Sequence, residues 1–402
     1  YDFYSDMEKN KATFESLEPG AGKKLEEHLE RGGLQYRIAK QEFMYKNYDS
    51  IFDFLNKRVM TEGRKLPIFK KMSDIVNSTF KNELLQKVLQ YQTVLLGTSP
   101  YNTPGIYSLM NYVDFVDGVW YPKGGIHKLI EALVTVAKKN GVAFRTEAPV
   151  EQIIIENGTA VGVRLENGEE LRADFVISNA DYQHTETKLI SPDYRDHSPA
   201  YWDKQILAPS AFIMYLGVDG KAPSLSHHNL LFSQDWKKNF YEIFDKVSWP
   251  SSPSIYVSKP SQTDDSVAPV GTENMFVLVP IGSGLTYSEE EMKAYGDKVL
   301  SIIEKTMMVE GLSKRILYRR DYCVKDFQKD YNSYKGTALG PAHTLMQTAF
   351  FRSNNMSKKV KNLYYVGAYT NPGIGMPVCL ISAELAYKRI ENITDPSPLT
   401  SL

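Results

Sequence analysis

A loop rich in glycine and proline, between an apolar run and a helical pattern, most constrains how this chain can fold. The stretch YVGAYTNPGIGMPVCLISAELAYKRI occupies residues 365–390, and three glycines and two prolines fall between Gly367 and Pro377. Glycine allows positive φ and a close approach of the backbone, and a helix that follows directly presents free N–H groups. The pattern predicts a strand, a tight loop and a helix that together bring backbone close to a ligand.

Composition sets the class of the molecule. The chain has 402 residues, of which 42% are hydrophobic and 24% charged, values typical of a folded protein long enough for two domains. Its net charge of -1 gives no basic surface, so we expect no nucleic-acid partner. The apolar runs are too short to span a membrane, and no signal peptide pattern opens the sequence. The first residue is Tyr1 rather than methionine, so we expect the natural chain to start upstream.

The spacing of cysteine and histidine argues against a metal site. Cys323 and Cys379 are the only two cysteines, and neither belongs to a CxxC motif. His227 and His228 are adjacent, and in a strand this spacing places two side chains on opposite faces. We therefore expect no metal ligands and a reducing, cytoplasmic compartment.

Hydrophobic periodicity gives the coarse organisation. Residues 6–110 carry mainly helical patterns, including a long one over residues 74–96, and a further helix is predicted over residues 126–139. Two Asn-Gly pairs, at 157–158 and 167–168, interrupt alternating apolar and polar residues and predict three antiparallel strands. Residues 191–360 mix buried strands with helices, one of which begins at a Ser288–Glu291 capping box.

The usual fingerprint of a dinucleotide site is absent from this sequence. The nearest approach is LVPIGSGLTYSEEE, where Tyr287 stands in place of the third glycine of GxGxxG. Three glutamates follow at the start of the helix, where their charge would repel a pyrophosphate. We interpret this segment as a loop that leads into a well-capped helix.

Four motifs in collinear order carry a resemblance to a known family. They are WYPKGGIHKLIEAL, APVEQIII, DFVISNAD and LYYVGAYTNPGIGMP. Over essentially its whole length the chain resembles the carotenoid desaturases of the bacterial phytoene desaturase type, which are FAD-dependent flavoproteins similar to amine oxidases. Members of this family begin with a strand, a GxGxxG turn and an acidic ribose partner. The resemblance implies that the sequence in hand lacks this N-terminal unit.

The resemblance implies a mixed α/β fold with two domains, of the amine-oxidase and glutathione-reductase type. Residues 1–118 would form a helical region associated with substrate and membrane, and residues 191–360 a mixed-sheet substrate-binding domain. Residues 119–190 and 361–395 would be segments of the FAD domain. The helical region would serve as a lid or membrane-associating region, because KRVMTEGRKLPIFKKM, residues 57–72, mixes basic and apolar side chains.

The resemblance also implies an oxidoreductase that acts on CH–CH groups in carotenoid biosynthesis, with FAD as cofactor. A hydride would pass from an allylic CH2–CH2 unit to flavin N5, and a proton would leave the adjacent carbon. The substrate would be phytoene or a related linear carotene, held in a hydrophobic tunnel by an enzyme attached peripherally to a membrane surface. A quinone or oxygen is the candidate electron acceptor.

Candidate site residues follow from the matched motifs. Many members of the family have Glu-Pro where this chain has Ala342 and His343. His343 is therefore the candidate catalytic proton acceptor, although a lone histidine is more often a structural hydrogen-bonding residue. The candidate flavin contacts are Gly124, Gly125, Val150, Ala180, Gly367, Ala368, Gly373, Gly375, Met376 and Pro377.

Two alternatives remain open. The same fold would suit a hydroxycarotenoid desaturase, a carotene isomerase or a reductase similar to retinol saturase. A flavin-free lipid-binding protein would account for the absent GxGxxG. An upstream GxGxxG in the gene would exclude the lipid-binding protein.

Overall fold

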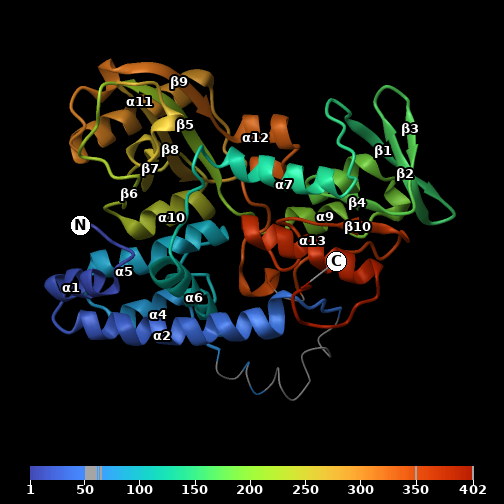
Figure 1. Cartoon of the computed structure of the whole chain (residues 1–402), viewed down its shortest axis with the longest axis horizontal. Helices are drawn as coiled ribbons and strands as arrows, with labels where there is room; N and C mark the ends of the chain where they lie inside the picture. Colours follow the sequence, from blue (N-terminus) through green and yellow to red (C-terminus); the bar gives the residue numbers. More distant parts are fainter. Residues whose placement is uncertain (50–60, 62, 64–65, 349–350, 401–402) are drawn as a thin grey trace. The chain divides into compact units, whose positions relative to one another are not determined.

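The computed structural model describes residues 1–49, 61, 63, 66–348 and 351–400. These residues group into two compact units (Figure 1). The first unit comprises residues 1–119, 149–208 and 339–402, and the second comprises residues 120–148 and 209–338. The bounds of the units differ from those of the four predicted segments, whose functional assignment stays a prediction. Much of the predicted membrane-associating segment, residues 57–60, 62 and 64–65, lies outside the described residues.

Helices make up the N-terminal part of the first unit. The helical pattern over residues 74–96 is broken at Phe80, where the backbone is extended, and the Asn82 side chain caps the helix that follows. Asp6 caps the first helix in the same way. The α-helices that the described residues of this unit form are α1 (Met7–Leu17), α2 (Ala21–Ala39), α4 (Met72–Thr79), α5 (Glu83–Gln90), α6 (Leu109–Tyr112), α8 (Tyr182–His184), α9 (Pro199–Asp203) and α13 (Met376–Ile390).

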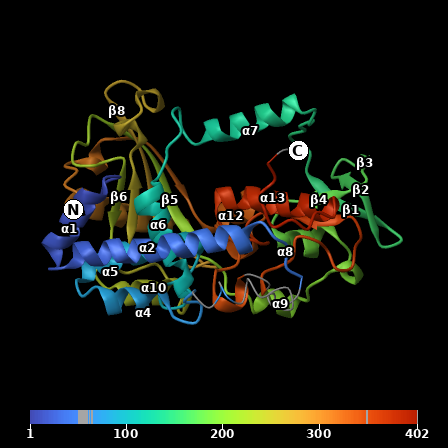
Figure 2. The same cartoon turned by 60° about the horizontal axis from the view of Figure 1, so that its bottom comes forward.

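Two small sheets complete the first unit. The three predicted antiparallel strands are confirmed as β1 (Val150–Glu156), β2 (Thr159–Leu165) and β3 (Glu170–Arg172). The β1–β2 turn places Asn157 and Gly158 at φ values of 50° and 75°, as an Asn-Gly hairpin requires. The second sheet pairs β4 (Val176–Ser178) in parallel with β10 (Leu363–Tyr365). Both views place β4 beside α13 (Figures 1 and 2).

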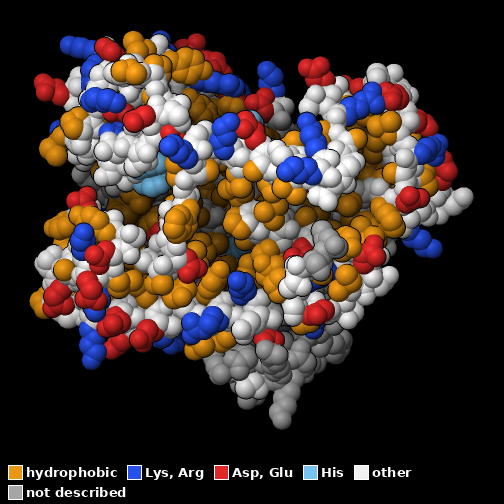
Figure 3. Space-filling view, viewed as in Figure 1, with side chains coloured by type: hydrophobic (Ala, Val, Ile, Leu, Met, Phe, Trp, Pro, Cys, Tyr) orange, Lys and Arg blue, Asp and Glu red, His pale blue; other side chains and the backbone are white. Residues whose placement is uncertain are grey.

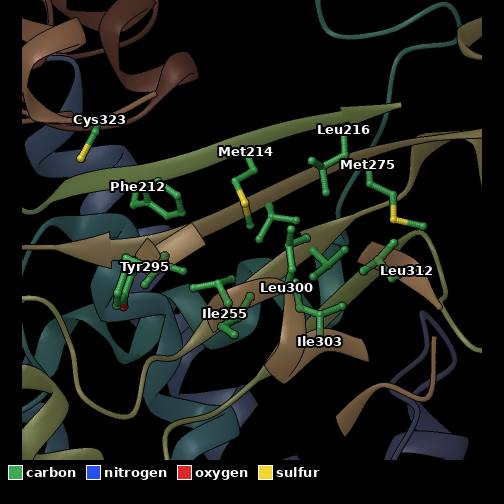
Figure 4. Close-up of a cluster of buried hydrophobic side chains, with 14 of the residues drawn as sticks. Phe212, Met214, Leu216, Ile255, Met275, Tyr295, Leu300, Ile303, Leu312 and Cys323 are labelled. Atoms are coloured by element: carbon green, nitrogen blue, oxygen red, sulfur yellow. The ribbon is translucent and has the colours of Figure 1, made fainter. Parts of the chain in front are cut away.

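The second unit is built on a five-stranded sheet of order β6-β7-β8-β5-β9. Helix α11 packs against it through Tyr295, Leu300 and Ile303, and Figure 4 shows these side chains facing those of β5 and β8. The predicted capping box of α11 is confirmed, since Ser288 accepts the Glu291 N–H and Glu291 accepts the Ser288 N–H. The strands and α-helices are β5 (Ser210–Asp219), β6 (His228–Leu231), β7 (Ile255–Ser258), β8 (Thr272–Ile281), β9 (Ile316–Tyr322), α7 (His127–Lys139), α10 (Trp236–Phe244), α11 (Glu289–Thr306) and α12 (Val324–Tyr331).

Helix α7 has no buried residue. Its apolar side chains Ile130, Leu133 and Val136 are all exposed. Among the described helices, none is long and apolar enough to span a membrane.

The expectation for the adjacent histidines is wrong. His227 precedes β6 instead of lying within it, so the two rings stack with centroids 4.3 Å apart. Within the described part of the chain, no cluster of three metal-ligating side chains forms.

Candidate functional site

The parallel strands β4 and β10 end at the same edge of their sheet. The Val366 N–H donates to Ser178 O at 3.0 Å, and the Asn179 side chain donates to Val366 O at 3.0 Å. This places the segment that contains Ala180 next to the start of the loop at Gly367. Ligands of α/β sheets bind at the carboxyl ends of such strands. The structure therefore brings Ala180 and the Gly367–Pro377 loop together.

The three loop glycines take conformations that other residues rarely adopt. Gly367, Gly373 and Gly375 have φ values of 106°, 132° and 127°. A Cβ on Gly367 would lie 2.6 Å from Asn179 Nδ2, and one on Gly373 would lie 2.2 Å from His343 Nε2. Only glycine fits at these two positions, so the loop keeps its bare backbone against the surrounding side chains.

The start of α13 is left open to a ligand. Helix α13 begins at Met376, with Pro377 in the first turn, where proline's missing N–H costs nothing. The side chains of Met376 and Leu380 are 47% and 51% exposed. Figure 3 shows apolar side chains at the surface around α13. A helix start with unpaired N–H groups and a positive dipole end favours an electron-rich, partly apolar ligand.

Asn355 ties the loop to α13 from beneath. Its side-chain amide is within hydrogen-bonding distance of Ser382 Oγ at 3.1 Å, Thr370 Oγ1 at 3.3 Å and Asn371 O at 3.3 Å. Ser382 in turn accepts the Gly367 N–H at 3.1 Å. Because Asn355 is buried, this network fixes the loop relative to the helix.

His343 is buried behind the loop, with both ring nitrogens engaged. Its Nε2 accepts the Ile374 N–H at 3.1 Å, so Nδ1 carries the proton in the neutral ring and donates to Tyr107 Oη at 2.7 Å. Tyr107 Oη lies 2.7 Å from Thr348 Oγ1. Burial, and then the charge of Arg352, lower the pKa of His343 well below 6.5. The ring is neutral and holds the loop in place, and its catalytic role stays a prediction.

The remaining candidates belong to other elements, and no contact of theirs with this loop is described. Val150 opens β1 and is paired with Leu165 of β2. Gly124 and Gly125 belong to the second unit, where the Gly124 N–H donates to the Asp264 carboxylate at 2.6 Å. Their flavin contacts stay predictions.

Asp181, which follows Ala180, caps α8 by accepting the His184 N–H at 2.9 Å. Its carboxylate also accepts a hydrogen bond from Tyr369 Oη. Asp181 therefore links the end of β4 to the loop, in addition to its role as a cap.

Sequence reasoning missed three residues that shape the loop: Tyr107, Arg352 and Asn355. Arg352 donates to Ala368 O with Nε at 3.2 Å. The stretch FFRSNN, in which an arginine follows two phenylalanines, was the available signal for a buried cation. Tyr107 lies far away in the sequence and gave no signal of its own.

The described residues fit a flavin. The loop offers a cradle that a Cβ would fill at Gly367 and Gly373, and α13 directs its positive end to the same place. The loop and the first turn of α13 would hold the ring system, with backbone N–H groups as donors.

Comparisons with known proteins give the family. The family model for flavin containing amine oxidoreductases matches residues 6–390. Carotenoid 3,4-desaturase from Haloarcula japonica is 42% identical over 394 residues, which cover 98% of this chain and 79% of the relative. The zeta-carotene-forming phytoene desaturase of Myxococcus xanthus is 34% identical over 380 residues, with 94% and 72% covered.

Solved structures agree on the fold. An oxidoreductase from Methanosarcina mazei has a TM-score of 0.53 at 19% identity, covering 80% of this chain and 68% of that one. Putrescine oxidase has a TM-score of 0.53 at 11% identity, covering 92% and 75%. The expected mixed α/β fold is confirmed, and a flavin-free lipid-binding protein does not suit the family. The chain belongs to the carotenoid desaturases, enzymes of carotenoid biosynthesis within the flavin-containing amine oxidoreductases.

Proposed function

We propose that this enzyme uses FAD to desaturate phytoene or a related linear carotene. The observation that carries the proposal is the loop Gly367–Pro377, whose glycine conformations and helix start suit a flavin ring. The curated relatives are named as carotenoid 3,4-desaturase and phytoene desaturase, which supports a carotene as substrate. FAD, when bound, supplies the two-electron acceptor for the hydride that leaves the carotene.

The chain's own residues would act by position. An allylic carbon that loses a hydride leaves a delocalised cation, and the proton on the neighbouring carbon becomes acidic enough for water or a weak group to accept it. The loss of the hydride and the proton from adjacent carbons forms one new carbon–carbon double bond. The neutral His343 ring and Asn355 would hold the loop, and exposed apolar side chains such as Met376 and Leu380 would contact hydrocarbon and exclude water.

The 42% identity to a carotenoid 3,4-desaturase favours a second candidate, desaturation at the 3,4-position of a carotenoid. The two candidates differ in the substrate consumed. Protein expressed from the complete reading frame, supplied in separate liposomes with phytoene and with a carotenoid that already has a long conjugated chain, distinguishes them by chromatography. Conversion of phytoene supports the first candidate. Conversion of the conjugated carotenoid but not of phytoene excludes the first candidate and supports the second.

We also propose that the enzyme works at a membrane surface, because its substrate is a hydrocarbon. Phe69 is 90% exposed and is followed by the exposed Lys70 and Lys71, a combination that suits an anionic bilayer. Sedimentation with anionic liposomes measures this binding. Phe69→Ser should reduce the bound fraction, whereas Val270→Ser, at a fully exposed position in the second unit, should leave it unchanged. Equal binding of both variants would exclude Phe69 as a contact.

A further inference from the structure

Arg352 is a buried cation with neutral partners. Its side chain donates to three backbone carbonyls: Nη1 to Gln347 O at 3.0 Å, Nη2 to Pro341 O at 3.0 Å, and Nε to Ala368 O at 3.2 Å. The residue is 4% exposed. Among the described residues, no carboxylate lies within ion-pairing distance of its guanidinium. The carbonyl dipoles solvate the charge but do not neutralise it.

The charge persists at neutral pH. Burial lowers the pKa of Arg352 to about 10, which still leaves the guanidinium protonated at pH 7. The ionisable groups that interact with it most are the hydroxyls of Tyr107, Tyr201 and Tyr369 and the thiol of Cys379. Burial raises the pKa of Tyr107, Tyr201 and Cys379, so these three groups are uncharged at neutral pH. A buried ion without an opposite charge is costly, so an anion nearby would be strongly favoured.

The guanidinium lies directly beneath the loop that we assign to the flavin. It contacts Ala368 O, and a Cβ on Gly373 would be 3.5 Å from Arg352 Nε. Arg352 also lines a cavity of about 250 Å³, together with Asp49 and Asp196. These two carboxylates make the cavity a poor place for a free anion. The loop side is therefore where a negative charge would be stabilised.

We propose that Arg352 is an electrostatic positioning residue, whose unpaired charge beneath the loop favours negative charge on a bound flavin and so stabilises its reduced form over its oxidised form. The inference rests on the proposed function, since it requires a flavin at this loop. A hydride brings two electrons and one proton, so the ring gains negative charge unless a further proton enters. A fixed cation in a site of low dielectric lowers the free energy of that charge.

The midpoint potential of the bound flavin tests this without any carotene. Flavin-loaded protein from the complete reading frame would be titrated anaerobically against a reference dye, as wild type, Arg352→Met and Arg352→Lys. We expect Arg352→Met to weaken the preference for reduced over oxidised flavin at least about tenfold, which is about 30 mV for a two-electron couple. Arg352→Lys keeps the charge and should recover most of the difference. The affinity for oxidised FAD should change much less.

Arg389→Gln is the matched control, because Arg389 is also a largely buried arginine, in α13, but is paired with Asp49. Its flavin should keep the wild-type potential. If Arg352→Met retains no flavin, Arg352→Gln replaces it, because its amide can still donate to Ala368 O.

Three outcomes overturn the inference: an unchanged potential in a neutral variant, no recovery by Arg352→Lys, or loss of flavin from both neutral variants when Arg352→Lys retains it at wild-type potential. The last outcome would mean that the charge of Arg352 is needed to bind oxidised and reduced flavin alike. Wild-type protein without any flavin would instead defeat the proposed function itself.

Discussion

At the scale of single residues, the loop depends on contacts that leave no room for a side chain. Gly373 is the tightest case, since its Cα faces His343 Nε2 and its φ is 132°. Arg352 lies close to the same turn, because a Cβ on Gly373 would be 3.5 Å from Arg352 Nε. The residues that we assign to the flavin are thus held by buried neighbours that need not touch the flavin themselves.

Gly373→Ala should move the loop. The added Cβ would overlap the His343 ring and force an unfavourable φ, so we expect a loss of about 1–3 kcal/mol in the free energy of unfolding and weaker flavin binding. Denaturant unfolding and FAD titration measure the two effects. Gly20→Ala is the control, because Gly20 also has positive φ but nothing lies within 4 Å of its Cβ position. Equal losses in both variants would mean that the His343 contact is unimportant.

The neutral state of His343 makes stability depend on pH. Its pKa is lowered in the folded protein, so below pH 6.5 the unfolded chain binds the proton and the folded chain does not. The stabilising effect of the neutral ring is therefore present above pH 6.5 and is lost as pH falls. Between pH 7.5 and 5.5 the wild type should lose about 1.4 kcal/mol more than His343→Gln, whose amide oxygen can still accept the Ile374 N–H. Thermal unfolding at the two pH values measures this, and parallel losses would show that His343 is protonated when folded.

At the scale of elements, the site is an assembly of β4, β10, the loop and α13. The paired strands β4 and β10 form the sheet edge at which the loop begins. The Asn355–Ser382 network joins the loop to α13. The hairpin β1–β2–β3, the α11 capping box and the start of α13 could be predicted from sequence, because Asn-Gly turns, Ser-x-x-Glu and Pro act locally. The break at Phe80 and the pairing of β4 with β10 could not, since they depend on tertiary contacts.

Asn355→Leu should weaken this assembly. The leucine would leave Ser382 Oγ, Thr370 Oγ1 and Asn371 O without the Asn355 donor in a buried place, a cost of about 1–3 kcal/mol. Denaturant unfolding measures the change. Asn140→Ala, at the exposed end of α7, is the control and should stay within about 0.5 kcal/mol of the wild type. A result for Asn355→Leu as small as the control's would contradict the proposed network.

At the scale of the whole molecule, the family and the position of the loop were predictable from collinear motifs. The buried residues that hold the loop were not. Tyr107 and His343 are 236 residues apart in sequence but hydrogen-bond directly. Arg352 and Ala368 are linked across 16 residues. Such pairs carry no periodic signal, so the sequence indicates which loop we assign to the flavin without indicating which residues hold that loop.

The central claim is that this enzyme passes a hydride from a carotene to a flavin held at the Gly367–Pro377 loop. The direct test is anaerobic mixing of flavin-loaded, full-length protein with phytoene in liposomes, followed by absorbance. We predict that oxidised flavin absorbance bleaches in proportion to the new conjugated double bonds, and that Gly373→Ala slows both changes together. Stable flavin absorbance with no new polyene, for phytoene and for other carotenes alike, would contradict the account.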